Sequence, residues 1–147
     1  MGRQLRVMVL DTSVTSRKIL EVIISREGHR VTSFGDPAEA LCFLHHYGPA
    51  DLLFLSMDLP GMGSIGVLKY LREEPSFRSV VPIALLGSRD GILRGVRARV
   101  SGAQRVVKKP LVRAQIVSLV SGTPVRAHSL GIGTPGDLQL VVRKESD

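Results

Sequence analysis

The chain has 147 residues, of which 44% are hydrophobic, and it carries a net charge of +7 and one cysteine, Cys42. This length and composition fit one ordinary domain with a buried core and exclude extended disorder over most of the chain. No apolar run is long enough to cross a bilayer and the N-terminus is not a signal peptide, so we expect a soluble cytoplasmic protein. A single cysteine excludes an internal disulfide, and we interpret Cys42 as a small buried hydrophobic residue.

Strand-like and helix-like segments alternate along the first 120 residues. Five short apolar segments are typical of buried parallel strands. They are residues 5–10, 30–34, 51–55, 80–86 and 105–107. Helical patterns follow each of them, with Ser13 and Asp36 as N-cap residues and Gly102 at a helix end. In the fourth helix we expect Leu93, Val96 and Val100 to form the stripe that faces the core. Five such units predict an α/β fold with a doubly wound, five-stranded parallel sheet.

The composition changes after residue 121. We therefore predict a domain over residues 1–121, a linker rich in glycine and proline over 122–137, and a short C-terminal tail over 138–147. The tail contains a strand-like segment, Leu138 to Val142, which could join a sheet edge, contact a partner or open a further domain. Gly131 to Gly136 spells a dinucleotide fingerprint, but it lies in the linker and does not follow a strand, so we set it aside.

Four motifs at the predicted carboxyl ends of strands have the order and spacing of one family. They are Val7 to Ser13, Leu53 to Met62, Val81 to Ser88, and Gly102 through Lys109-Pro110. Together they resemble the receiver domains of two-component response regulators, over residues 4–121 and in a form like the chemotaxis regulators. The resemblance implies the flavodoxin-like strand order 2-1-3-4-5.

The resemblance also implies a phosphorylation site in which several positions have changed. In the family, two carboxylates and an acceptor aspartate hold magnesium, a hydroxyl contacts the phosphoryl group, and a lysine neutralises its charge. Here Asp11 and Thr12 match the two carboxylates, Ser56 the acceptor, Gly87 the hydroxyl and Lys109 the lysine. Asp58 matches the loop position that gives only its backbone carbonyl to the metal, and Val106 stands in place of a mobile aromatic residue. We interpret this set as a vestigial site, in which Lys109 pairs with Asp11.

The chemistry of the changed positions argues against a phosphorylation switch. An acyl phosphate needs a carboxylate nucleophile, and Ser56 has no neighbouring general base in the sequence. Asp11 alone would hold magnesium poorly. We therefore expect no bound metal, no cofactor and no enzymatic activity, and we predict a phosphorylation-independent signalling or adaptor module.

The excess charge points to the surface through which such a module would act. Residues 88–113 hold eight basic side chains and one acidic side chain, whereas the rest of the chain is balanced. In receiver domains this region is the docking face of the fourth helix, fifth strand and fifth helix. We predict partner contacts through Arg94, Arg97, Arg99, Arg105 and Lys108.

The sequence leaves several classes of partner possible for this face. We favour an acidic protein surface of a signalling or motility assembly, with a homodimer through the same face as a further option. The alternative from another class is a basic module that binds nucleic acid or a nucleotide, although no aromatic residue interleaves with the arginines to stack bases. In a third interpretation, the chain is the receiver part of a longer protein.

Overall fold

A computed structural model describes residues 3–60 and 63–122. Strands and helices alternate along these residues as the apolar pattern predicts. In chain order they are β1 (Arg6–Leu10), α1 (Val14–Arg26), β2 (Arg30–Phe34), α2 (Pro37–Tyr47), β3 (Leu52–Ser56), α3 (Gly63–Glu73), a 3-10 turn (Pro75–Phe77), β4 (Val81–Leu86), α4 (Ile92–Ser101), β5 (Arg105–Lys108) and α5 (Arg113–Ser121). Apart from Gly122, the predicted linker and the tail lie outside the described residues.

The five strands form one parallel sheet in the order β2-β1-β3-β4-β5. The predicted fold class and strand order are therefore confirmed. Since all strands run the same way, their carboxyl ends meet at one edge of the sheet, which is where open α/β sheets place their functional residues.

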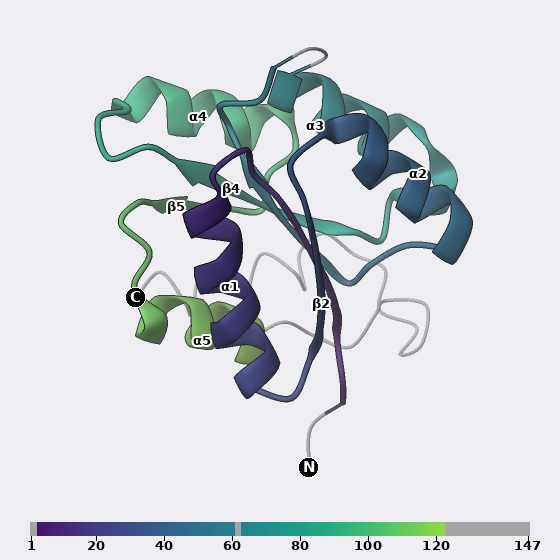
Figure 1. The fold of residues 1–147 in the computed structure, drawn as a ribbon. Helices are drawn as coiled ribbons and strands as arrows, with labels where there is room; N and C mark the ends of the chain where they lie inside the picture. The colour runs from purple at the N-terminus through teal and green to yellow at the C-terminus, as the bar shows by residue number, and fades with distance from the viewer. Residues whose placement is uncertain (1–2, 61–62, 123–147) are drawn as a thin grey trace.

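Helices cover both faces of the sheet (Figure 1). Alternate residues of each strand point to opposite faces, so that Val7 and Val9 of β1 pack with α1 and α5, while Met8 and Leu10 pack with the helices of the other side, α2, α3 and α4. Because both faces are covered, the central strands β3 and β4 are almost entirely apolar, and all five residues of β3 are buried.

Local capping fixes where the helices begin and end. The Ser13 hydroxyl accepts a hydrogen bond from the Ser16 N–H at 3.1 Å, which confirms the predicted start of α1. Asp36 caps α2 in the same way, with Pro37 in the first turn. Gly102 ends α4 with a φ of +130°, a backbone conformation that favours glycine.

The fourth helix packs with the face opposite to the one predicted. Ile92, Leu93, Val96 and Val100 are 51–82% exposed, whereas Ala98 is fully buried. A Cβ atom placed on Gly95 would lie only 3.5 Å from Leu86 and 3.6 Å from Val106, so the helix approaches the sheet closely through its small residues. The predicted core stripe of Leu93, Val96 and Val100 is therefore wrong, and these apolar side chains lie on the surface.

Two further predictions are corrected by burial. Arg105, assigned to the partner-binding face, is only 7% exposed. In β5 it shares a face with Val107, which packs against α1 and α5, so it points away from Lys108 and from α4. Cys42, interpreted as a buried residue, is exposed on α2.

Within the described residues, no helix is both long enough and apolar enough to span a membrane.

The orientation of α4 can be tested by substitution. We expect Leu93→Ala to change the free energy of unfolding by no more than about 0.5 kcal/mol, because this side chain is exposed. Ala98→Leu should destabilise the fold by about 1–3 kcal/mol, because the buried site has no room for the added atoms. Urea unfolding of the two variants checks both values, and the opposite ranking would restore the predicted core stripe.

Candidate functional site

The site lies at the carboxyl edge of the sheet, where Asp11 follows β1 and Lys109 follows β5. Lys109 Nζ lies 2.8 Å from Asp11 Oδ2, and the other oxygen of that carboxylate accepts the Ser13 N–H at 2.9 Å. The Asp11 side chain is 2% exposed and that of Lys109 is 24% exposed. The structure therefore brings together the pair that the sequence predicted, and it joins residues 98 positions apart.

Backbone hydrogen bonds between neighbouring strands hold these residues in place. The Asp11 N–H donates to Phe34 O at 3.0 Å, and the Lys109 N–H donates to Leu86 O at 2.8 Å. On the first turn of α1, the Arg17 guanidinium donates to Asp11 O at 2.7 Å. The ladders of the sheet thus continue into the site and leave little freedom in the positions of Asp11 and Lys109.

Ser56 occupies the centre of this edge, at the end of β3. The residue is 3% exposed, and its hydroxyl accepts the Asp58 N–H at 3.1 Å. Its backbone carbonyl accepts a hydrogen bond of 2.6 Å from Ser64, in the first turn of α3. The Ser56 side chain is therefore buried and held by the loop that follows it.

A second charged group joins the loops after β3 and β4. Arg94 of α4 donates to Met57 O and to Asp58 Oδ1, both at 2.6 Å, and its other terminal nitrogen lies 3.4 Å from Asp90 Oδ1. Asp90 Oδ2 in turn accepts the N–H of Gly87 at 2.7 Å. We call Asp58, Asp90 and Arg94 the loop clasp, because one guanidinium bridges the two carboxylates and a backbone carbonyl.

The remaining predicted positions border this network. Thr12 is exposed in the loop between Asp11 and α1. Gly87 follows β4, and a Cβ atom placed there would lie 3.4 Å from Asp90 Oδ2 and 3.8 Å from Asp58 Oδ2. The space beside Gly87, where the family resemblance implies a hydroxyl, thus lies next to two carboxylates of the clasp.

The donor set does not fit a magnesium ion. Both oxygens of Asp11 and one oxygen of Asp58 already contact nitrogen donors, and a serine stands between them. The acidic side chains of the edge are paired with basic ones, since Asp11 contacts Lys109 while Asp58 and Asp90 contact Arg94. Magnesium sites need carboxylates with free oxygens, so this arrangement offers little to attract the ion.

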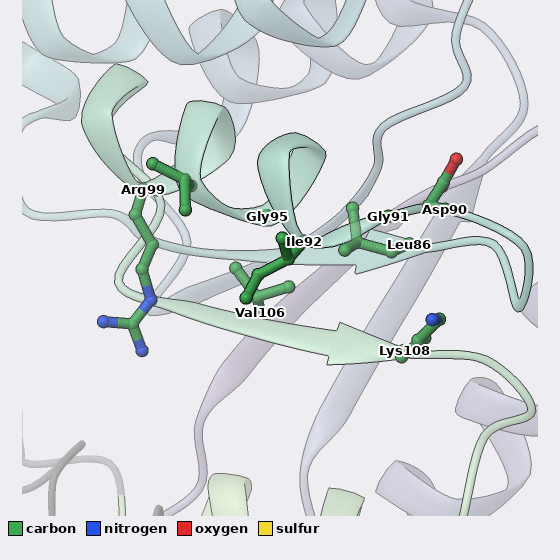
Figure 2. Close-up of a pocket in the computed structure, with 9 residues that line it drawn as sticks. Leu86, Asp90, Gly91, Ile92, Gly95, Arg99, Val106 and Lys108 are labelled. Carbon is green, nitrogen blue, oxygen red and sulfur yellow. The ribbon is translucent and has the colours of Figure 1, made fainter.

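The basic residues predicted to bind a partner do not form one row. Arg94 is engaged in the clasp, and Arg97 lines a pocket on the α3 side of α4. Arg99 and Lys108 line a different pocket, between α4 and β5 (Figure 2). Within residues 3–60 and 63–122, Arg97, Arg99 and Lys108 form no salt bridge.

Sequence reasoning missed the roles of Arg17, Arg94 and Asp90 in this network. Asp90 and Arg94 are four residues apart, a spacing at which helical side chains commonly pair, and this signal was available. Their contact with Asp58 joins positions 36 residues apart and depends on the tertiary fold.

A parallel sheet of order 2-1-3-4-5 with an aspartate and a lysine meeting at its carboxyl edge is typical of the receiver class of α/β domains. The sequence profile of the response regulator receiver domain matches residues 7–121. The chain therefore belongs to the response regulator receiver domain family.

Individual relatives agree with this assignment. Protein PilG of Pseudomonas aeruginosa is 26% identical over 130 residues, which cover 85% of this chain and 95% of PilG. The DNA-binding response regulator MtrA of Mycolicibacterium smegmatis is 31% identical over 115 residues, which cover 78% of this chain; the chain spans about half the length of that relative, 48%.

Solved structures show the same fold at low sequence identity. A putative response regulator from Chloroflexus aurantiacus superposes with a TM-score of 0.76 at 21% identity, over 82% of this chain and 98% of that one. Chemotaxis response regulator CheY4 of Vibrio cholerae gives a TM-score of 0.74 at 16% identity, over 83% of this chain and all of that one.

Asp11 is more deeply buried than Lys109, so we expect substitutions of the two residues to destabilise the fold by different amounts. Lys109→Met should lower the free energy of unfolding by about 3–5 kcal/mol, because it leaves a buried carboxylate without a cation. Asp11→Asn should cost less, because the Lys109 ammonium can reach solvent. Chemical unfolding measures both, with Lys18→Met, at an exposed pair with Glu21, as a control that changes by no more than about 0.5 kcal/mol. Equal costs for the two site variants would contradict this assignment of burial.

Proposed function

We propose that the chain is a cytoplasmic, phosphorylation-independent signalling module that acts by contact with a protein partner. The main observation in support of the proposal is the identity and burial of the residue at position 56. A buried serine whose hydroxyl accepts a backbone N–H stands where the family resemblance implies the phosphate-accepting carboxylate. Serine cannot form the acyl phosphate of that chemistry. We therefore regard the receiver domain as degenerate.

The surrounding charges support the same proposal. Lys109, the cation that the resemblance assigns to the phosphoryl group, is already paired with Asp11. The loop clasp joins the loops after β3 and β4 through groups of the chain itself. An incoming phosphoryl group would have to replace these contacts, and the carboxylates described at this edge are already engaged, so they offer no magnesium site to balance its charge. In the described part of the chain, the Ser56 hydroxyl has no hydrogen bond to a carboxylate or an imidazole, so an enzymatic role lacks a general base.

The basic residues around α4 indicate what the module contacts. Arg97, Arg99 and Lys108 are exposed, and no other described side chain neutralises them. Clustered positive charge accelerates association with acidic surfaces. We propose an acidic protein surface of a signalling or motility assembly as the partner, with self-association through the same face as a second mode.

Nucleic acid is the alternative partner. It is favoured by the excess charge of +7 in residues 88–113 and by the DNA-binding description of the MtrA relative. Phosphate contacts would make binding fall steeply with salt concentration. The exposed apolar residues of α4 favour a protein partner instead, because phosphate groups make no use of them.

Phosphoryl uptake provides the direct test. After incubation with acetyl phosphate and Mg²⁺, we expect intact-mass spectrometry to find the wild-type chain unmodified, because no carboxylate occupies position 56. A receiver domain with carboxylates at these positions serves as the reagent control. Label located on Asp11 or Asp58 by peptide mapping would contradict the proposal.

Affinity capture tests the partner class. From native lysate, we expect the wild-type chain to retain a protein after nuclease treatment, and Arg97→Glu/Lys108→Glu to lose at least about 90% of it, because each change reverses a surface charge. Arg94 is left intact, since its substitution would also disrupt the loop clasp. Lys18→Glu/Arg26→Glu on α1 is the matched control for charge. Capture that disappears with nuclease would assign the surface to nucleic acid.

A further inference from the structure

A pocket of about 370 Å³ lies at the other end of the sheet from the Asp11–Lys109 site. It is bounded by α2 and by the amino ends of β1 and β2, and its lining includes Arg6, Met8, Arg30, Thr32, Phe43 and Tyr47. None of these residues belongs to the carboxyl edge of the sheet or to the basic stretch of residues 88–113. The volume falls at the lower end of the range of pockets that bind small ligands.

Two arginines from neighbouring strands face this pocket. Arg6 of β1 is paired with Arg30 of β2 in the parallel register, and both lie on the side of the sheet to which Met8 points and which α2 covers. The described residues that line the pocket include no aspartate or glutamate, and neither arginine forms a salt bridge within residues 3–60 and 63–122. Like charges at paired positions of a sheet repel each other, so an anion between them would stabilise the pair.

Contacts with the end of α2 hold one of these guanidinium groups in place. Arg6 Nη1 donates to Pro49 O at 3.2 Å, and Arg6 Nη2 lies 3.5 Å from Gly48 O. A guanidinium has more N–H donors than these two contacts use, so several are left for a ligand. Asp51 accepts the backbone N–H of Arg6 at 2.8 Å and is not among the residues that line the pocket. Arg6 is therefore oriented before binding, while the exposed Arg30 can follow a ligand.

Aromatic rings line the α2 side of the pocket. The ring centroid of Phe43 lies 4.5 Å from that of Tyr47 and 5.2 Å from that of Phe34. The chain has only four phenylalanines and two tyrosines, so half of its aromatic residues gather here. Tyr47 is 59% exposed, which allows a planar group to stack against its ring.

We propose that this pocket binds a mononucleotide, with its phosphate between Arg6 and Arg30 and its base stacked against Tyr47. Arginine binds phosphate oxygens through parallel N–H donors, and neighbouring strands lie about 4.8 Å apart, so both guanidinium groups reach one phosphate. An aromatic ring stacks with any of the common bases. This site goes beyond the proposed function, since it uses none of the residues assigned to the partner.

The same features disfavour other occupants. An acidic protein segment spreads its carboxylates along its length, whereas the two arginines start from paired positions and suit a single group of high charge density. Inorganic phosphate would make no use of Phe43 and Tyr47, and an uncharged aromatic compound would leave both arginines unused. A ligand that joins a planar ring to one phosphate matches both halves of the lining.

Isothermal titration calorimetry on the full-length chain tests the proposal, with AMP, GMP, CMP and UMP as the probes. We expect at least one of these nucleotides to bind. Its nucleoside and inorganic phosphate should each bind at least about tenfold more weakly, because each contacts only one half of the pocket.

Substitutions at two exposed lining residues separate the two halves of the site. Arg30→Glu should weaken nucleotide binding at least about tenfold, because it places a carboxylate beside the phosphate. Tyr47→Ala should weaken it about fivefold or more through the loss of stacking, whereas Tyr47→Phe keeps the ring and should retain at least about half of the affinity. Arg26→Glu, at an exposed arginine of α1, is the matched control for charge and should change the affinity by no more than about twofold.

These variants are chosen to keep the fold. Arg30 and Tyr47 are exposed, so both variants should unfold at the same urea concentration as the wild type. Arg6 is left intact because it also holds the end of α2. Amide chemical shifts in NMR spectra locate the bound nucleotide, and the changes should concentrate at residues 6–8, 30–32 and 43–50.

Several results would overturn the inference. These are the absence of binding by all four nucleotides, an affinity that Arg30→Glu leaves unchanged, and a nucleoside or inorganic phosphate that binds as tightly as the nucleotide. Shift changes confined to residues 88–113 would place nucleotide binding on the basic stretch instead. A lysate protein that is lost on Arg30→Glu, without any nucleotide binding, would assign the pocket to a protein. The proposed function fails on different results, namely phosphoryl uptake on Asp11 or Asp58, or capture that Arg97→Glu/Lys108→Glu leaves unchanged.

Discussion

A buried carboxylate needs a cation, and in this fold the requirement is met by the contact between Asp11 and Lys109. The contact joins the end of β1 to the end of β5, with β3 and β4 between them in the sheet. It requires β1 and β5 to run in the same direction, because only then do both carboxyl ends reach the same edge. The geometry of the edge, from Ser56 to the loop clasp, depends on this arrangement.

The sheet and its edge could be predicted from sequence because their signals are local. Strands buried on both faces are apolar runs, and the caps at Ser13 and Asp36 mark helix starts within a few residues. The Asp11–Lys109 contact spans 98 residues, but the family resemblance supplied both positions. Here a remote contact became predictable because each partner ends a recognisable strand.

The predictions for α4 and Arg105 were wrong for a different reason. Along α4, Leu93, Val96 and Val100 have helical spacing, but so do the small residues Gly91, Gly95 and Ala98 on another side of the helix. Hydrophobicity favours the first set, whereas the close approach of the helix to Leu86 and Val106 selects the second. The spacing of residues along the sequence does not specify how closely the helix approaches the sheet. Arg105 was misplaced because charge was counted along the chain without the alternation of side chains in β5.

The loop clasp has a consequence for any change of charge at the site. Arg94 pairs with both Asp58 and Asp90, so a Ser56→Asp substitution would place another carboxylate at an edge where Arg94 and Lys109 are already paired. Like charges at short range without a counter-ion oppose one another. Substitution of Ser56 alone would therefore add a carboxylate without a counter-ion, because the charged side chains around it already form the contacts that keep the two loops together.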